Sequence, residues 1–292
     1  MELYTITHKK YRYPTERIYI PIVAGSAEYS EFNFPSNYLR DDVCDNISNM
    51  HDLYSEYTIN YWIWKNSKAD VVGINHYRRY FIRGNWLTYL RCILNSSKQI
   101  NKFRINDNDI NTIFNKGYNC IVPKKQWRVN RTMRQEFDEA NSPELLDATE
   151  TIIQKKYKKY TKDFERVFGS LENHQKCICI MSKPLFDEYS EWIFGIYSEL
   201  IEMGYTGHNR EFAFLGERLM NVWLEYNKRI KRIHAKELFF VNVEFSLKDI
   251  KRNYTEIILP KFLRNILRII AKLKIEIVTG DGSFRIRRKE KN

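Results

Sequence analysis

Three residues that could bind an anion stand directly after a short apolar segment. Residues 71–74 are apolar, largely β-branched and closed by polar residues, which predicts a buried strand. His76, Arg78 and Arg79 come just beyond it. Open α/β sheets bind ligands at the carboxyl ends of their strands, and guanidinium groups match the oxygens of a phosphate. The pattern favours a phosphate-bearing ligand, although a basic surface turn after a strand would have the same sequence.

A second group of residues is acidic. It consists of Asp41, Asp42, Asp45 and Asn46. Carboxylates this close repel one another unless a cation, basic side chains or sugar hydroxyls meet them. Carboxylate and amide groups are suited to hydrogen bonds with sugar hydroxyls, so the cluster is a candidate sugar-binding loop. The alternative is an acidic surface turn that caps a helix.

A third group lies late in the chain and contains Arg210, Glu211, Glu217 and Arg218. Arg210 and Glu217 are seven residues apart and would share one face of a helix. A carboxylate on that face could take a proton, provided that its position is right. The alternative is an ion pair of Glu217 with Arg210 or Arg218, which contributes little when it is exposed.

Strands and helices alternate along the chain, which predicts an α/β fold with a mixed sheet flanked by helices. The predicted strands are residues 3–7, 71–74, 119–123, 177–181 and 239–243. The predicted helices are residues 53–66, 144–168, 184–200 and 212–226. Residues 18–23 are apolar but contain Pro21, which indicates an edge strand or an irregular segment. Residues 84–115 are more polar and are expected to be an irregular insertion or a mobile acceptor lid.

The C-terminal part of the chain differs from the rest. We expect a division into residues 1–245 and a basic extension, residues 246–292. Within the extension, residues 259–274 place seven large apolar side chains on one face and five Lys or Arg on the other, which predicts a basic amphipathic helix. This helix would either bind an anionic membrane or dock on the main domain. The last eight residues, RIRRKEKN, are expected to be a disordered basic tail.

Composition limits the classes of function. The formal net charge is +12 and the pI is about 9.3, which suits nucleic acid, anionic lipid or an anionic substrate. No zinc-finger spacing and no aromatic RNA-binding signature is present, so we expect no nucleic acid partner. Five cysteines without a CxxC pair indicate free thiols and a reducing cytoplasm. The N-terminus does not look like a signal peptide, and no segment reaches the ~20 apolar residues that span a bilayer.

Several long blocks of the sequence carry a resemblance to a known family. They are VVGINHYRRYF, YLRDDVCDNIS, TINYWIWKN, CICIMSKPLFDEYSEWIFGI and FAFLGERLMNVWLEYN, and with their flanks they cover roughly residues 2–244. Together they resemble bacterial capsule and exopolysaccharide glycosyltransferases of the DUF4422 type. The resemblance implies a sugar-nucleotide-dependent enzyme with a GT-A-like α/β fold.

The resemblance also implies roles for individual residues. GT-A folds usually receive the nucleoside near the end of the first strand, where Thr5 and His8 stand in this chain. Many inverting GT-A enzymes carry their base at the start of a helix in the region of Glu217, which is the first candidate; Glu211 is the second. Arg210 and Arg218 would then either bind the acceptor or lie on the helix face as ion-pair partners.

One departure from the GT-A pattern concerns the metal. GT-A enzymes commonly hold a divalent cation with an Asp-x-Asp pair after a central strand, but His76-Tyr77-Arg78 stands at that place. We therefore expect Arg78 or Arg79 to meet the phosphates in place of a metal ion. No cofactor is expected, and Mn²⁺ or Mg²⁺ is disfavoured. The competing hypothesis is that Asp41, Asp42 and Asp45 bind the cation.

The sequence thus predicts a cytoplasmic glycosyltransferase, peripheral at the inner face of the cell membrane. It would move a hexosyl group, with galactofuranosyl and galactosyl as candidates, from a UDP-linked donor to a lipid-linked glycan in capsule, O-antigen or exopolysaccharide assembly. The alternative is a protein that binds a nucleotide sugar or phosphoglycan without turnover.

Overall fold

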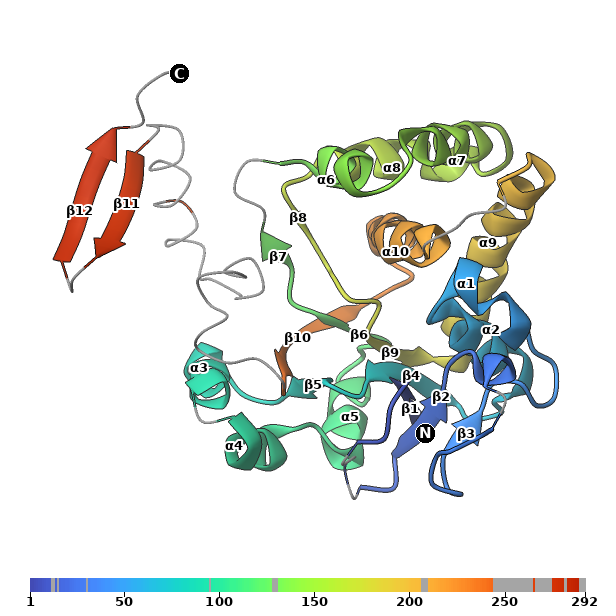
Figure 1. The fold of residues 1–292 in the computed structure, drawn as a ribbon, viewed down its shortest axis with the longest axis horizontal. Helices are drawn as coiled ribbons and strands as arrows, with labels where there is room; N and C mark the ends of the chain where they lie inside the picture. Colours follow the sequence, from blue (N-terminus) through green and yellow to red (C-terminus); the bar gives the residue numbers. More distant parts are fainter. Residues whose placement is uncertain are drawn as a thin grey trace.

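The computed structural model describes residues 1–11, 14, 16–29, 31–94, 96–127, 131–205, 210–243, 265, 275–280 and 283–288. Within these residues, eight strands form the main sheet (Figure 1). They are β1 (Glu2–Thr7), β2 (Tyr19–Val23), β3 (Leu39–Arg40), β4 (Val71–His76), β5 (Arg79–Ile82), β6 (Cys120–Pro123), β9 (Cys179–Ser182) and β10 (Ala235–Asn242). The predicted mixed α/β fold is confirmed.

The strand order reverses between β1 and β4, which makes this place the topological switch point of the sheet. Its order is β3-β2-β1-β4-β5-β10-β6-β9, and β9 also pairs with β4. The parallel strands β1, β2 and β3 follow one another outward, and the chain then returns to place β4 on the other side of β1. Such a switch point leaves a crevice beyond the carboxyl ends of the two central strands, where open α/β sheets bind ligands.

The far edge of β4 is shared by two antiparallel strands. β9 pairs with it from Val71 to Ile74, and β5 pairs with it at His76. Because β9 runs opposite to β4, the residues that lead into β9 lie beside the carboxyl end of β4. Segments about 100 residues apart in the sequence therefore meet at the crevice.

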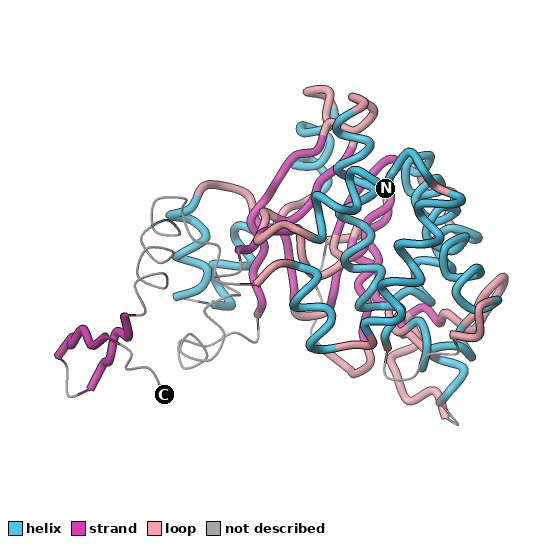
Figure 2. Tube along the Cα trace, turned by 90° about the horizontal axis from the view of Figure 1, so that it is seen from above, coloured by secondary structure: helices cyan, strands magenta, loops and turns pink. Residues whose placement is uncertain are grey.

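Helices cover both faces of the sheet (Figure 2). Their bounds are α1 (His51–Tyr54), α2 (Tyr57–Asn66), α3 (Trp86–Leu94), α4 (Ser96–Phe103), α5 (Asp107–Phe114), α6 (Met133–Ala140), α7 (Pro143–Lys156), α8 (Thr161–Phe168), α9 (Lys183–Glu202) and α10 (Glu211–Arg229), with single 3₁₀ turns at Ser26–Glu28, Ser48–Met50 and Lys158–Tyr160. The larger core contains side chains of α1, α2 and α6–α10, and the smaller one contains side chains of α3–α5. Neighbouring residues of β1 enter opposite cores, as strand alternation requires: Leu3 the smaller and Tyr4 the larger.

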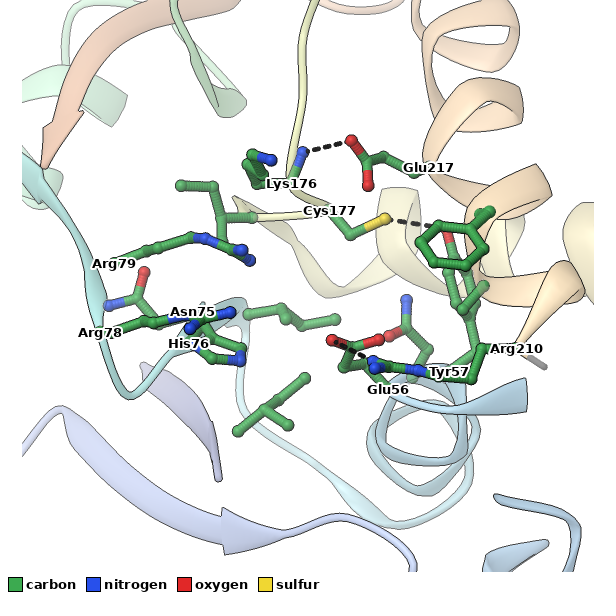
Figure 3. Close-up of a pocket in the computed structure, with 16 residues that line it drawn as sticks. Glu56, Tyr57, Asn75, His76, Arg78, Arg79, Lys176, Cys177, Arg210 and Glu217 are labelled. Carbon is green, nitrogen blue, oxygen red and sulfur yellow. Dashed lines mark hydrogen bonds and ion pairs between the residues drawn. The ribbon is translucent and has the colours of Figure 1, made fainter. Parts of the chain in front are cut away.

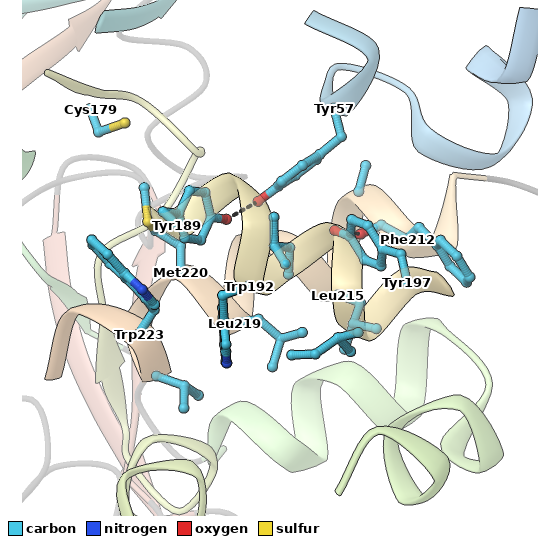
Figure 4. Packing of buried hydrophobic residues seen from close by; sticks show 14 of the residues in the cluster. Tyr57, Cys179, Tyr189, Trp192, Tyr197, Phe212, Leu215, Leu219, Met220 and Trp223 are labelled. Carbon is cyan, nitrogen blue, oxygen red and sulfur yellow. Dashed lines mark hydrogen bonds between the residues drawn. The ribbon is translucent and has the colours of Figure 1, made fainter. Parts of the chain in front are cut away.

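Helices α9 and α10 meet at a very close contact that fixes the start of α10 (Figure 4). A Cβ atom on Gly216 would lie 2.1 Å from the hydroxyl oxygen of Tyr197 and 2.4 Å from the ring of Tyr57. Tyr57 in turn shares a 2.8 Å hydrogen bond with Tyr189 of α9. Glycine is therefore required at position 216, and the close approach holds its neighbour Glu217 beside the segment that leads into β9.

Two predictions about strands and loops were wrong. Residues 18–23 are not an edge, because β2 lies between β1 and β3. Pro21 is tolerated there because β3 pairs with Ile22 and Val23, so the missing N–H of Pro21 leaves no bond to β3 unmade. Residues 84–115 are not irregular, since they form α3, α4 and α5. Apolar side chains such as Tyr89 and Ile110 are buried in the smaller core.

Two predicted long helices are each interrupted. Residues 53–66 are divided at Ser55, whose φ of 46° ends α1 before α2 begins. Residues 144–168 are divided after Lys156, where a 3₁₀ turn brings Tyr157 and Tyr160 against Trp192. The burial of aromatic rings prevails here over the helical propensity of the segment.

The predicted amphipathic helix at residues 259–274 lies outside the described residues except for Asn265. Beyond it, the disordered tail was predicted wrongly in part, because β11 (Ile275–Gly280) and β12 (Ser283–Arg288) form an antiparallel hairpin. Alternating Ile and Phe on either side of Gly280-Asp281-Gly282 is the hairpin signal that the sequence analysis missed. Two further short strands, β7 (Gln126–Trp127) and β8 (Glu172–Asn173), pair with each other.

Candidate active site

A pocket of about 200 Å³ opens at the carboxyl ends of β1 and β4 (Figure 3). The crevice at the switch point of the sheet is therefore open to a ligand. Its lining comes from the ends of β1 and β4, the start of β5, the segment before β9, and the first turns of α2 and α10. The residues are Ile6, Glu56, Tyr57, Asn60, Ile74, Asn75, His76, Arg78, Arg79, Lys176, Cys177, Ile178, Arg210, Ala213, Phe214 and Glu217.

The tight connection between β4 and β5 brings three of the predicted residues into the pocket. His76 pairs with Arg79 across a two-residue turn that contains Arg78. Burial, followed by the charges of Arg79 and Arg78, lowers the pKa of His76 to about 2. His76 is therefore neutral at physiological pH, and it can exchange hydrogen bonds with a ligand without supplying positive charge.

Three buried polar side chains at this end of the sheet have unpaired atoms within the described residues. Thr5 and Asn75 are register partners on β1 and β4, and each is at most 1% exposed. Neither the Thr5 hydroxyl nor either amide atom of Asn75 has a hydrogen-bond partner in the described part of the chain, and the same is true of His76 Nδ1. Buried polar groups are almost always paired, so these atoms indicate that a ligand or water completes the site.

The segment before β9 forms a strained wall of the pocket. Lys176 and Cys177 both have positive φ, 78° and 46°, although neither is glycine. The backbone N–H of Lys176 donates to Glu217 Oε1 at 2.9 Å. Burial raises the pKa of the Cys177 thiol well above 9, so this cysteine is not a nucleophile at neutral pH.

The opposite wall is made by the starts of two helices. Arg210, which precedes α10 with φ of 67°, contacts Glu56 Oε1 at 3.1 Å and donates from Nε to Ser55 Oγ at 2.8 Å. Burial raises the pKa of Glu56, but the charge of Arg210 and hydrogen bonds outweigh it and hold this pKa below its ordinary value. The helix N-terminus of α10 adds further positive potential at the pocket.

Glu217 has the environment of an ionised carboxylate. Burial alone would raise its pKa, but the charges of Arg218, Lys176 and Arg79 and the N–H of Lys176 lower the pKa overall. Its side chain keeps 20% of its surface exposed. Glu217 is therefore negatively charged at neutral pH and open to a proton donor in the pocket.

The pocket as a whole is cationic. Among the described lining residues, four are Lys or Arg and two are Glu, which gives a formal charge of +2. Phe214 lies at the same site and is 39% exposed, an unusual position for a phenyl ring. Positive groups around a small polar cavity favour an anionic ligand, and the exposed ring offers an apolar face beside it.

The acidic residues predicted for the site lie elsewhere. Asp41 is fully buried, and its carboxylate accepts hydrogen bonds from the backbone N–H groups of Gly25 and Ser26 and from the hydroxyls of Ser26, Ser48 and Thr58, at 2.6–2.9 Å. These contacts tie β3 to the start of α2. The structure therefore gives Asp41 a structural environment rather than a place in the pocket.

Three neighbours of Asp41 also have partners inside the same loop or next to it. Asp42 is paired with Arg40. Asp45 is exposed and accepts from Tyr61 at 3.2 Å, and the side chain of Asn46 bridges the Cys44 carbonyl and the Ser48 N–H. Neither these residues nor Asp41 are among the described residues that line the pocket.

Four more predicted residues lie near the pocket but outside its described lining. Glu211 accepts two hydrogen bonds from Ser142, at 2.6 and 3.1 Å. Arg218 is 7% exposed, and its guanidinium lies 3.5 Å from Glu136 and 3.9 Å from Glu217. His8 is exposed, with its ring centroid 6.4 Å from that of His76, and Thr5 is buried beneath the site.

The sequence analysis missed several residues of the pocket: Glu56, Tyr57, Asn60, Asn75, Lys176, Cys177 and Phe214. Asn75 stands inside the motif that was singled out, directly before His76, and both residues line the pocket because β4 ends there. Lys176 and Glu56 carry no local signal, because their place follows from the pairing of β9 and the packing of α2. Among the described residues, no group of three or more His, Cys, Asp or Glu could hold a metal ion.

No helix in the described part of the chain combines the length and the apolar character that crossing a membrane requires.

Comparisons with known proteins agree with the sequence blocks noted above. A family described as "Domain of unknown function (DUF4422)" matches residues 2–228. The apo structure of the bifunctional glycosyltransferase WbbM superimposes with a TM-score of 0.71 and 23% identity, over 83% of this chain and 45% of that one. The chain thus spans less than half the length of that protein. No protein with a curated description matches the sequence.

Proposed function

Because the chain belongs to the DUF4422 family and shares its fold with a bifunctional glycosyltransferase, we propose that it is a sugar-nucleotide-dependent glycosyltransferase with a GT-A-like fold. The observation that carries the proposal is the cationic pocket at the switch point of the sheet. A donor of this kind has a nucleoside, a diphosphate and a sugar, and the pocket offers groups suited to each.

The diphosphate is the leaving group, so its developing charge must be neutralised. Arg78, Arg79 and Arg210 would do this with charge-assisted hydrogen bonds, which are shorter and stronger than neutral ones. The N-terminus of α10, a helix of 19 residues, supplies a further favourable field. Asn75, with its unpaired amide, would bind a hydroxyl group of the ligand.

Glu217 is the proposed general base. If the transfer inverts the configuration at the sugar, the acceptor hydroxyl must lose its proton as it attacks. Glu217 is ionised and partly exposed, so it could accept that proton. Phe214, exposed at the same helix face, would lie against the apolar side of an acceptor sugar ring.

We propose that the reaction needs no divalent metal, since cationic side chains stand where GT-A enzymes commonly place carboxylates. Turnover should continue in excess chelator. Complete loss of turnover in chelator, restored by Mn²⁺ or Mg²⁺, would show that this part of the proposal is wrong.

The finer assignments rest on the resemblance of the sequence. The donor would be UDP-linked, the transferred group a hexosyl group such as galactofuranosyl or galactosyl, and the acceptor a lipid-linked glycan of capsule, O-antigen or exopolysaccharide assembly. The enzyme would work in the cytoplasm, at the inner face of the cell membrane.

The first experiment is a panel of nucleotide sugars tested for protection against thermal unfolding. A ligand present at about 100 times its Kd stabilises the folded protein by ~2.7 kcal/mol, which gives a clear rise in Tm. Donors that protect are then incubated with acceptor, and released nucleoside diphosphate is measured. Protection with release supports the enzyme, protection without release supports a non-catalytic binding protein, and no protection by any member contradicts both.

A second experiment tests the membrane part of the proposal by truncation before Leu259. Basic side chains near an anionic surface contribute about 1 kcal/mol each and are screened by salt. The truncated protein should keep its Tm and lose cosedimentation with anionic vesicles. A large fall in Tm, together with weak vesicle binding by the intact chain, would instead indicate a helix that docks on the main domain.

A further inference from the structure

We propose that Lys176 is a phosphate-binding residue, and that the strained turn Lys176–Cys177 is maintained in order to present its ammonium group to the ligand. The inference rests on the proposed function and adds a residue to that site.

Backbone strain is concentrated at the pocket. In the described part of the chain, six residues other than glycine have positive φ: Cys44, Ser55, Lys176, Cys177, Arg210 and Lys231. Three of these six line the pocket, and Ser55 is adjacent to the lining residue Glu56. Such conformations cost free energy, and they persist where contacts with the surrounding structure hold the backbone in place. They are often found at sites of binding or catalysis.

The strained turn is held from several sides. Glu217 accepts the Lys176 N–H, and Tyr57 lies 3.4 Å from the Cys177 sulfur. Two residues upstream, the Asn221 side chain bonds both backbone groups of His174, at 2.7 and 2.9 Å. Glu217 and Asn221 are one turn apart on α10, so a single rigid helix holds the backbone that leads into the strained turn.

Glycine would adopt this conformation without strain, but glycine has no side chain. Lysine at position 176 adds a third cation on the side of the pocket where Arg79 and Arg78 lie (Figure 3). The side chain is half-buried, and its charge contributes to the lowered pKa of Glu217. An ammonium group is a compact point charge suited to a phosphate oxygen.

The chain contains a matched control. Lys231 is also a lysine with positive φ, 58°, but it is exposed at the end of α10 and is not among the lining residues. Asparagine tolerates the left-handed conformation better than lysine and lacks its charge. Lys176→Asn and Lys231→Asn therefore relieve the same strain and remove the same charge, one inside the pocket and one outside it.

The experiment measures UDP affinity by calorimetry and Tm for the full chain and its variants. Both Asn variants should keep or raise Tm, by about 1–3 °C. Lys176→Asn should weaken UDP binding by about 10- to 100-fold, the range expected for the loss of one charge-assisted contact. Lys231→Asn should bind UDP as the parent does, and Lys176→Arg, which keeps the charge, should stay within a few-fold of the parent.

Two results would overturn the inference. One is UDP affinity in Lys176→Asn within twofold of the parent. The other is a fall in Tm for Lys176→Asn but not for Lys231→Asn, since Lys176 would then be stabilising the fold. If the parent binds UDP, Arg79→Ala loses binding and Lys176→Asn keeps it, only this inference fails. If the parent binds neither UDP nor any nucleotide sugar, the proposed function fails with it.

Discussion

The pocket at the end of β4 and the acidic loop at residues 41–46 looked alike in the sequence, since each packs several charged residues into a few positions. In the structure they differ in where their polar atoms find partners. Asp41 accepts five hydrogen bonds from its own chain, while both amide atoms of Asn75 and His76 Nδ1 have no partner among the described residues.

The comparison separates a structural cluster from a binding cluster. Internal partners offset the desolvation of Asp41, so its burial contributes to stability. Unpaired buried groups and strained backbone cost stability, and they are tolerated where a ligand completes the site. Density of charge in the sequence is common to both regions and does not distinguish them.

The largest expected effect is at the acidic loop. Asp41→Ala should lower the free energy of unfolding by about 3–5 kcal/mol, because it removes the acceptor of five buried hydrogen bonds. Of the five donors, the hydroxyls of Ser26 and Thr58 also reach a backbone carbonyl, and the other three have no second acceptor among the described contacts. Asp45→Ala, an exposed position in the same loop, should change it by less than about 0.5 kcal/mol. Urea unfolding followed by circular dichroism gives both numbers. Near-parental stability of Asp41→Ala would remove the distinction between the two regions.

In the pocket, Glu217→Gln should lower kcat by about 100-fold or more with little change in Tm, as expected for loss of a general base. Glu211→Gln is the control on the same helix, since its partner is Ser142, and its kcat should remain within about threefold of the parent.

The pH dependence gives a second readout for Glu217. Its pKa in the folded protein lies below the ordinary 4.5, so the carboxylate is ionised above that pH and protonates only as the pH falls below it. The acid limb of kcat/KM due to this group should therefore lie below pH 4.5. An acid limb near pH 6 that disappears in Glu217→Gln would contradict the assigned environment.

A smaller effect is expected from the pocket arginines. Arg78→Ala and Arg79→Ala should each weaken UDP binding by about 1.5–3 kcal/mol, measured by calorimetry. Arg40→Ala, which removes the partner of Asp42 in the acidic loop, should leave UDP binding unchanged. If both pocket variants bind UDP as tightly as the parent, the assignment of this pocket to the donor is wrong.

The smallest expected effect is the absence of a pH response from His76. A histidine with an ordinary pKa would gain charge as the pH falls through 6.5 and would strengthen anion binding. Because burial and Arg79 lower the pKa of His76 to about 2, donor affinity should show no inflection near pH 6.5 from this residue. This measurement should use a UDP-sugar as the ligand and not UDP, because a UDP-sugar has no terminal phosphate that titrates near pH 6. An inflection that His76→Gln abolishes would show that His76 is protonated in the complex.

Much of the pocket could be predicted because it depends on local pattern. A β-branched strand followed by His76, Arg78 and Arg79 puts those residues at the end of a strand whatever the rest of the chain does. Glu217 and Arg210 both line the pocket, but the predicted shared helix face was wrong for Arg210, which precedes α10 with φ of 67°. The roles of these residues stay predictions that the variants above test.

The predictions that the structure contradicts failed for a different reason. Asp41 looked like a ligand-binding carboxylate because its partners Gly25, Ser26 and Thr58 are 15 to 17 residues away in the sequence. Residues 84–115 looked irregular because Asn, Ser, Lys and Asp residues interrupt their apolar positions, but buried side chains such as Tyr89, Ile100 and Ile110 fill part of the smaller core. The capping box of Asn106 and Asp109 at the start of α5 was a local signal of helix that was not used.

The sequence by itself determined the α/β character, the family and the basic charge of the chain, because these follow from periodicity, from long ordered motifs and from composition. The tertiary structure alone decided which charged cluster lines a pocket and which is closed on itself. It also decided that Lys176 and Glu56 belong to the site, since strand pairing and the contact at Gly216 bring them there. The physical reason is that a charged side chain acquires its role from the partners and the solvent around it, and long-range packing sets both.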